Sequence, residues 1–264
     1  MPTSTEKPVV TVATEERVAV LTIDHPPVNA LSRRVLEELG GAIERLRDDA
    51  AVKVIVVTGA GSLAFVAGAD IKEVAQLTSA QEATQMAALG QSVFLKLQRI
   101  GKPVIAAING ICLGGGLELA MSCHLRISGD RVRFGQPEVN LGIIPGWGGT
   151  QRLPRLIGKA KATEWILTGD VVMAQEAARL GLVNSVVPQD QVLKAAKDLA
   201  RKIAAKSAVT VRQALCAIEE GLDGPLEEGL AKEAAVFGAV ANSDDSREGV
   251  KAFLEKRQPQ FKDR

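Results

Sequence analysis

Residues 102–123 read KPVIAAINGICLGGGLELAMSC, and this stretch decides the fold class. Its apolar run at 104–108 is typical of a strand buried in an α/β core. A glycine-rich loop at 109–118 follows at once, and residues 118–124 then favour a helix. Loops at strand ends in such sheets bind ligands, and glycines let a ligand approach the backbone. The stretch therefore predicts an α/β fold with a binding loop after a buried strand.

A second strand and loop of the same kind precede it. Residues 52–58 (VKVIVVT) predict a buried strand, and the glycine-rich segment 59–72 follows. Neither loop has the spacing of a dinucleotide or phosphate-binding loop, which leaves exposed backbone N–H groups as their chemical resource. Gly115 stands where a helix begins, so its N–H and the positive helix end can stabilise an oxyanion. A tight turn is the alternative reading of these glycines.

The rest of the chain divides into an α/β part followed by helices. Residues 9–14 and 18–24 predict a hairpin, Ser32 a helix cap, and Ser79 with Glu82 a capping box. After a last strand at 183–187, helical periodicity covers 189–206, 208–221, 225–241 and 246–256. We expect a polar tail at 1–8, a core at 9–190 and a helical region at 191–264.

Composition excludes several classes of protein. The 264 residues carry 32 Lys and Arg against 31 Asp and Glu, so no net field attracts nucleic acid or an anionic membrane. No apolar run approaches the roughly 18 residues of a membrane span. Three cysteines favour a reducing compartment, and we expect a cytoplasmic protein, although an organellar enzyme without its presequence would look the same. No metal-binding motif is present, and structural roles are expected for His25 and His124.

Two glutamates are the candidate acid and base. Glu118 falls in the first turn of the helix after the second glycine loop, and Glu138 follows in FGQPE (134–138). A first-turn glutamate can simply compensate the helix dipole. Two carboxyl groups beside an oxyanion hole can instead exchange protons, because their repulsion keeps one of them protonatable near neutral pH.

Several long strings resemble the enoyl-CoA hydratases of the crotonase superfamily, and the resemblance covers residues 9–264. The strings are AGADIKE (67–73), the 102–123 stretch, FGQPEVNLGIIPGWGGTQRLPRLIG (134–158), LTGD (167–170) and AARLGLVNSVVP (177–188). The implied fold is a spiral of β-β-α turns with a C-terminal helical trimerisation region. The implied assembly is a homotrimer or a hexamer of two trimers.

The resemblance also implies roles for individual residues. The backbone N–H groups of Ala69 and Gly115 match the oxyanion hole, and Glu118 and Glu138 match the catalytic pair that adds water to a 2-enoyl-CoA. Coenzyme A is then part of the substrate, and no metal or other cofactor is implied. The residues that match the coenzyme A and substrate site are Val28, Ala30, Leu31, Ala67, Gly68, Asp70, Ile71, Lys72 and Gly114.

Three further residues carry hypotheses about the substrate. The Trp147 indole either lies over the acyl tail and shortens its channel, which predicts short-chain preference, or packs its loop away from substrate. Phe253 and Lys256 lie in a segment that resembles the helix reaching a neighbouring subunit's coenzyme A. Phe253 would pack near the adenine and Lys256 would face the phosphates, and a solvated charged run is the alternative.

Two other functions compete with hydration. A crotonase-fold isomerase moves a double bond and can work with one carboxylate, whereas hydration must deprotonate water and protonate carbon. Glutamate at both 118 and 138 therefore favours hydration. A non-catalytic RNA-binding or scaffold protein of the same fold is disfavoured by the balanced charge and the complete glutamate pair.

Overall fold

Six strands form the larger sheet of the computed structural model, which describes residues 7–264. They lie in the order β1-β2-β3-β5-β7-β10, and only the β1–β2 hairpin is antiparallel. The predicted hairpin and buried strands are thus confirmed. The strands are β1 (Val10–Glu15), β2 (Val18–Ile23), β3 (Val54–Gly59), β5 (Val104–Ile108), β7 (Leu125–Gly129) and β10 (Ser185–Val187).

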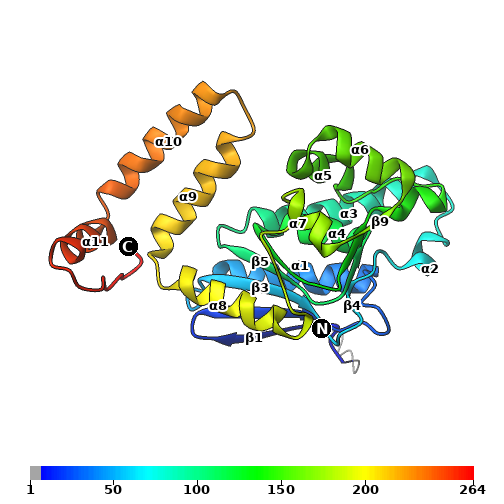
Figure 1. Cartoon of the computed structure of the whole chain (residues 1–264), viewed down its shortest axis with the longest axis horizontal. Helices are drawn as coiled ribbons and strands as arrows, with labels where there is room; N and C mark the ends of the chain where they lie inside the picture. Colours follow the sequence, from blue (N-terminus) through cyan, green and yellow to red (C-terminus); the bar gives the residue numbers. More distant parts are fainter. Residues whose placement is uncertain (1–6) are drawn as a thin grey trace.

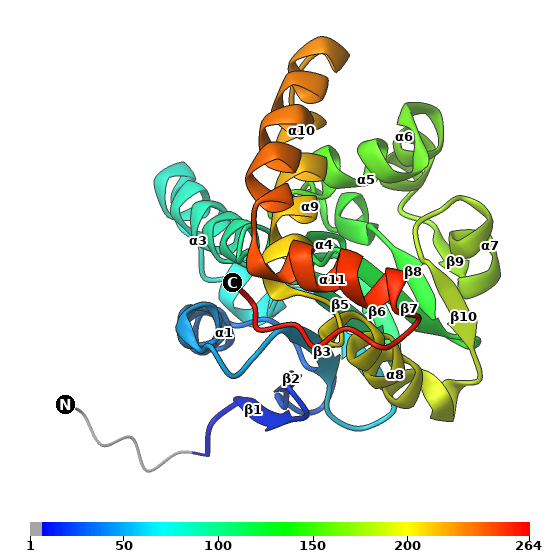
Figure 2. The same ribbon diagram turned by 90° about the vertical axis from the view of Figure 1, so that its left-hand side faces the viewer.

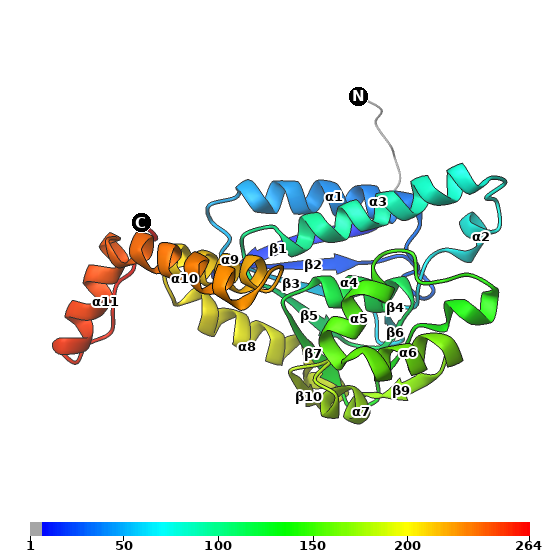
Figure 3. The same ribbon diagram turned by 90° about the horizontal axis from the view of Figure 1, so that it is seen from above.

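Both faces of this sheet are covered. Successive side chains of β3 point to opposite faces, so Val54 and Val56 join one apolar cluster while Ile55 and Val57 join another. Helix α8 (Val192–Ala204) packs on the first face, and α1 (Arg33–Asp48) and α3 (Ala80–Gln98) lie on the second (Figure 3). This burial on both sides is why β3 and β5 read as continuous apolar runs.

A smaller sheet has the order β4-β6-β8-β9. From β3 to β8 the chain alternates between the two sheets, and each turn adds one strand to each of them. This is the spiral that the resemblance implies. The glycine-rich segments predicted as loops thus contain two strands, and the sequence analysis missed β8 and β9 as well as β7 of the larger sheet. The small-sheet strands are β4 (Ala64–Val66), β6 (Ile111–Leu113), β8 (Arg133–Gly135) and β9 (Val171–Met173).

Two helices begin where the sequence predicts their caps. The Ser32 side chain accepts a hydrogen bond from Val35 N–H at the start of α1, and the Ser79 side chain accepts one from Glu82 N–H at the start of α3. The remaining helical elements of the core are α2 (Ile71–Val74), α4 (Gly115–Ser122), η1 (Pro137–Leu141), α5 (Gly149–Ile157), α6 (Lys159–Thr168), α7 (Ala174–Arg179) and η2 (Gln189–Gln191).

The last three helices project away from the core. They are α9 (Ala208–Gly221), α10 (Leu226–Ala241) and α11 (Asp244–Leu254), and α9 and α10 run side by side (Figure 1). Helix α8 belongs with the sheet it covers, although the predicted division places it in the helical region. Residues 1–6 of the predicted tail lie outside the described residues. Among residues 7–264, no helix is long and apolar enough to cross a membrane.

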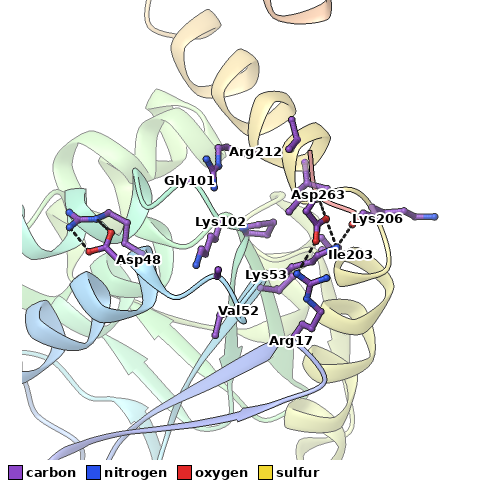
Figure 4. A pocket seen from close by; sticks show the side chains of 17 residues that line it. Arg17, Asp48, Val52, Lys53, Gly101, Lys102, Ile203, Lys206, Arg212 and Asp263 are labelled. Carbon is purple, nitrogen blue, oxygen red and sulfur yellow. Dashed lines mark hydrogen bonds and ion pairs between the residues drawn. The ribbon is translucent and has the colours of Figure 1, made fainter. Parts of the chain in front are cut away.

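The end of the chain returns to the core, as seen from the side of these helices (Figure 2). Asp263 forms ion pairs with Lys53 at 2.6 Å and Arg17 at 2.8 Å, and it accepts a hydrogen bond from Ala208 N–H. These contacts border a cavity of about 290 Å³ between the core and the start of α9 (Figure 4). The C-terminal segment is therefore tied to both the larger sheet and the projecting helices.

Candidate active site

The two glycine-rich segments meet at the N-terminal end of α4. A Cβ atom placed on Gly115 would lie 3.4 Å from the backbone nitrogen of Ala69, and one placed on Gly114 would lie 3.8 Å from the Gly68 Cα. The structure therefore brings together two segments that are more than forty positions apart in the sequence.

The backbone N–H groups of Ala69 and Gly115 are both left unused by the backbone hydrogen bonds around them. Leu31 pairs with Ala69 through the neighbouring residues, because its N–H donates to Gly68 O and its carbonyl accepts from Asp70 N–H. In such a parallel bridge the N–H of Ala69 itself points away from Leu31. Gly115 is the first residue of α4, where an N–H has no partner within the helix. Both donors are thus available to an oxygen atom of a ligand.

Glu118 lies in the first turn of α4 with 1% of its surface exposed. Its Oε1 accepts hydrogen bonds from the backbone N–H groups of Trp147 at 2.8 Å and Gly149 at 2.7 Å. Burial raises the pKa of this carboxyl to about 7, although these two N–H groups and the Arg152 charge favour the carboxylate. Glu118 is therefore a buried acid that titrates near neutral pH.

Glu138 lies in η1 with its carboxyl group against Gly114. Its Oε2 is buried and has no hydrogen-bond partner among the described residues. Burial and then repulsion from Glu118 raise the pKa of Glu138 to about 7 as well. The two carboxyl groups are electrostatically coupled, so one of them can hold a proton while the other is charged.

The residues predicted for coenzyme A surround Ala69. Ala67 N–H donates to Val28 O, and the Asp70 side chain caps α2 by accepting from Lys72 N–H. Ile71 and Lys72 are exposed, Val28 and Ala30 are half-buried, and Leu31 is buried in the core. Backbone hydrogen bonds thus hold the segments 28–31 and 67–72 side by side, next to the Ala69 amide.

Trp147 packs inside the protein with 5% of its surface exposed. The indole N–H donates to Met86 O, and the ring stands edge-on to Phe94. A Cβ atom on Gly90 would lie 2.4 Å from this ring, and one on Gly115 would lie 2.5 Å from it. The indole is therefore packed in the core against Gly115, and its predicted relation to the acyl tail stays a prediction.

Phe253 and Lys256 are not brought to the glutamates within one chain. Phe253 is 81% exposed near the end of α11, and Lys256 is exposed just beyond that helix. Helix α11 lies at the end of the projecting helices, away from α4 in the core (Figure 1). Their predicted contact with a neighbouring subunit's ligand stays a prediction.

The histidines and cysteines lie in structural surroundings. His25 Nδ1 is 2.7 Å from Ala30 O, and His124 Nδ1 accepts from Val104 N–H. Cys112 and Cys123 are buried free thiols, and burial raises the pKa of Cys123 to about 12. Within residues 7–264, no group of three or more His, Cys, Asp or Glu side chains is placed to hold a metal ion.

Two side chains near the glutamates escaped the sequence analysis. Arg152 donates to Trp147 O, and the Gln136 side-chain amide donates to Gly114 O. Both lie inside the string 134–158, but nothing in their local pattern distinguishes them from surface polar residues. Their role depends on which backbone groups the fold places beside them.

Comparison with known proteins identifies the family. The enoyl-CoA hydratase/isomerase family model matches residues 13–264. The chain is 47% identical to a crotonyl-CoA hydratase of Syntrophomonas wolfei, covering 94% of this chain and 95% of that protein. It is 44% identical to a short-chain-enoyl-CoA hydratase of Clostridium acetobutylicum, covering 95% and 96%. A solved enoyl-CoA hydratase of Bacillus anthracis superposes with a TM-score of 0.94 at 39% identity, covering 97% and 100%. The chain therefore belongs to the enoyl-CoA hydratase/isomerase family.

Proposed function

We propose that the protein is an enoyl-CoA hydratase, a hydro-lyase that adds water across the double bond of a 2-enoyl-CoA to give a 3-hydroxyacyl-CoA. The observation that carries this proposal is the pair of carboxyl groups on Glu118 and Glu138, both with a pKa of about 7. They lie at the end of α4 beside the free N–H groups of Ala69 and Gly115. Names of relatives at 44–47% identity support the same reaction.

In the proposed reaction the two amides receive the thioester oxygen. Addition of hydroxide at C3 leaves negative charge on this oxygen as an enolate, and two fixed donors there stabilise it by several kcal/mol in a dry site. Protonation at C2 then completes the product. Because the charge gathers on one oxygen that the backbone can bind, we propose that no metal or redox cofactor is required and that coenzyme A enters only with the substrate.

The surroundings of the two glutamates suggest different roles. Hydrogen bonds to Glu118 from two N–H groups favour its charged form, so we assign to it the deprotonation of water. Glu138 has an unpartnered buried oxygen and is repelled by Glu118, so its protonated form is favoured and it supplies the proton to C2. We assign binding of the coenzyme A arm to the segments 28–31 and 67–72.

Hydration of crotonyl-CoA, followed by loss of its ultraviolet absorbance, tests the proposal. Proton transfer by a positioned side chain contributes about 10²- to 10⁴-fold, so Glu118→Gln and Glu138→Gln should each lower kcat by that order while acyl-CoA still binds. The double variant should lose far less than the product of the two, because both residues act on one transition state. Wild-type turnover no faster than either variant would overturn the assignment.

The same experiment separates the competing functions. An isomerase would tolerate loss of one glutamate and would convert 3-enoyl-CoA faster than it hydrates crotonyl-CoA. A non-catalytic scaffold would show neither activity. The presence at one site of two coupled carboxyl groups, one buried and one half-buried, favours the hydratase, since a scaffold gains nothing from taking them out of water.

We also propose that the projecting helices join copies of the chain into a homotrimer or a hexamer in the cytoplasm. Large apolar side chains are exposed along them, and such a surface is costly in water unless it is covered. A second copy is the proposed cover, and Phe237→Glu should give monomers by light scattering. An unchanged mass would contradict it. The exposed residues include Ile218, Leu222, Leu226, Leu230, Phe237, Val250, Phe253 and Leu254.

A further inference from the structure

Arg152 reaches back from α5 to the loop that binds Glu118. Its Nη1 donates to Trp147 O at 2.9 Å, and its Nε donates to the Gln98 side-chain oxygen at 3.0 Å. Gln98 is the last residue of α3, so the guanidinium is held between this helix and the loop that contains Trp147. Two directed hydrogen bonds at known positions fix the plane of the guanidinium.

The peptide group that Arg152 holds lies inside the Glu118 binding loop. Trp147 N–H and Gly149 N–H both donate to Glu118 Oε1, and the carbonyl between them accepts from Arg152. Gly148 has a φ of 117°, and a Cβ atom there would lie 2.1 Å from Arg152 Nη1. The guanidinium thus occupies the space beside Gly148 and supports the turn that directs both N–H groups at the carboxylate.

Resting on the proposed function, we propose that Arg152 is a positioning residue for the hydration, acting on Glu118 through the Trp147–Gly148 peptide. It fixes the two backbone donors, and its positive charge favours the carboxylate form of Glu118. Gln98 anchors the guanidinium in this orientation. Removal of the guanidinium should therefore leave Glu118 harder to ionise and less well placed.

Electrostatics give the same direction. Burial raises the pKa of Glu118, and the positive charge of Arg152 lowers it. Conversely, burial lowers the pKa of Arg152, and the negative charge of Glu118 raises it. Glu118 in turn repels Glu138, and the buried Cys123 thiol lies near Arg152. Without Arg152, one of the effects that counteract burial is lost, so the pKa of Glu118 should move further above its ordinary value.

The pH profile of kcat/KM distinguishes this role from simple structural support. Glu118 must be charged to deprotonate water, so activity appears as pH rises through the acidic limb of the profile. In Arg152→Gln we expect this limb to move up by roughly one pH unit, which makes the loss of kcat/KM well below pH 7 about tenfold greater than the loss at high pH. A residue that only supports the fold would lower the whole profile without moving the limb.

Matched variants complete the design. Arg155 is exposed on the same helix and bonds to Gln151, so Arg155→Gln should leave the profile unchanged. Arg152→Lys keeps the charge without the two-point geometry, and we expect a smaller shift of the limb with a lower maximum. Should Arg152→Gln fold poorly, Gln98→Leu removes only the anchor and should move the limb in the same direction. An unmoved limb in every folded variant would overturn the inference.

A readout without turnover separates this inference from the proposed function. In protein with ¹³C-labelled glutamate carboxyl groups, the Glu118 resonance is identified by its loss in Glu118→Gln and is titrated by NMR. We expect its pKa to be higher in Arg152→Gln than in wild type. If the wild type is inactive but the pKa of Glu118 still shifts in Arg152→Gln, the hydratase proposal is refuted and the Arg152–Glu118 coupling stands. Active wild type with equal titrations would refute the coupling alone.

Discussion

Gly114 leaves the space that the Glu138 carboxyl group occupies. A Cβ atom on Gly114 would lie 2.9 Å from Glu138 Oε1, closer than such contacts occur in proteins. Gly114 also has a φ of +51°, in the left-handed region that side chains disfavour. The glycine before α4 therefore serves the carboxyl group as well as the turn.

We expect Gly114→Ala to lower kcat by about a hundredfold, because a displacement near 1 Å at a catalytic group has that order of effect. Steady-state hydration of crotonyl-CoA measures it. Gly61→Ala is the matched control, since Gly61 also has a positive φ of 75° but nothing within 4 Å of an added Cβ. Equal losses in the two variants would show that backbone strain, and not contact with Glu138, limits activity.

The buried glutamates should make stability fall as pH rises. Both have a pKa of about 7 when folded and about 4.3 when unfolded, so the folded state binds more protons between these values. Their stabilising effect is fully present below the unfolded pKa and is lost as pH rises through the folded one.

Denaturant unfolding at several pH values tests this. From pH 4 to pH 8 the wild type should lose roughly 3 kcal/mol relative to Glu118→Gln, whose amide does not titrate. Glu37→Gln, at an exposed position of α1, should follow the wild type at every pH. Parallel curves for wild type and Glu118→Gln would mean that Glu118 titrates at its ordinary pKa.

Trp147 offers a test of the two hypotheses about its indole. The indole is buried against Gly115, and the backbone N–H of Trp147 binds Glu118. If the indole supports this loop and does not contact the acyl chain, Trp147→Phe should lower kcat/KM equally for crotonyl-CoA and decenoyl-CoA. Trp147→Ala should also cost about 3–5 kcal/mol of stability by leaving a cavity. A changed ratio between the two substrates in Trp147→Phe would instead support contact with the acyl chain.

Lys256 tests the predicted contact with a neighbouring subunit's ligand. Lys256→Ala should raise KM for crotonyl-CoA severalfold and leave KM for crotonyl-pantetheine unchanged, because only the first carries nucleotide phosphates. Lys251→Ala, which changes an exposed lysine on the preceding helix α11, is the control. Equal changes for both thioesters would favour the solvated charged run.

Local sequence determined the main elements of the fold because their signals are short in range. The apolar runs at 52–58 and 104–108 form β3 and β5, and Ser32 and Ser79 cap the helices that follow them. Period and capping depend on residues within a few positions, so one sequence suffices to read them. The three-residue strands of the smaller sheet were missed because they are too short to show a period.

The chemistry of the site was decided only by tertiary structure. The sequence supplied Glu118 and Glu138, but their raised pKa values come from burial and from each other, which depend on packing. Arg152 reads as one more surface cation until the fold sets it against the Trp147 carbonyl. The sequence does not show that the indole of Trp147 fills the space left by Gly90 and Gly115. Such contacts join segments far apart in the chain, where local pattern carries no information about distance.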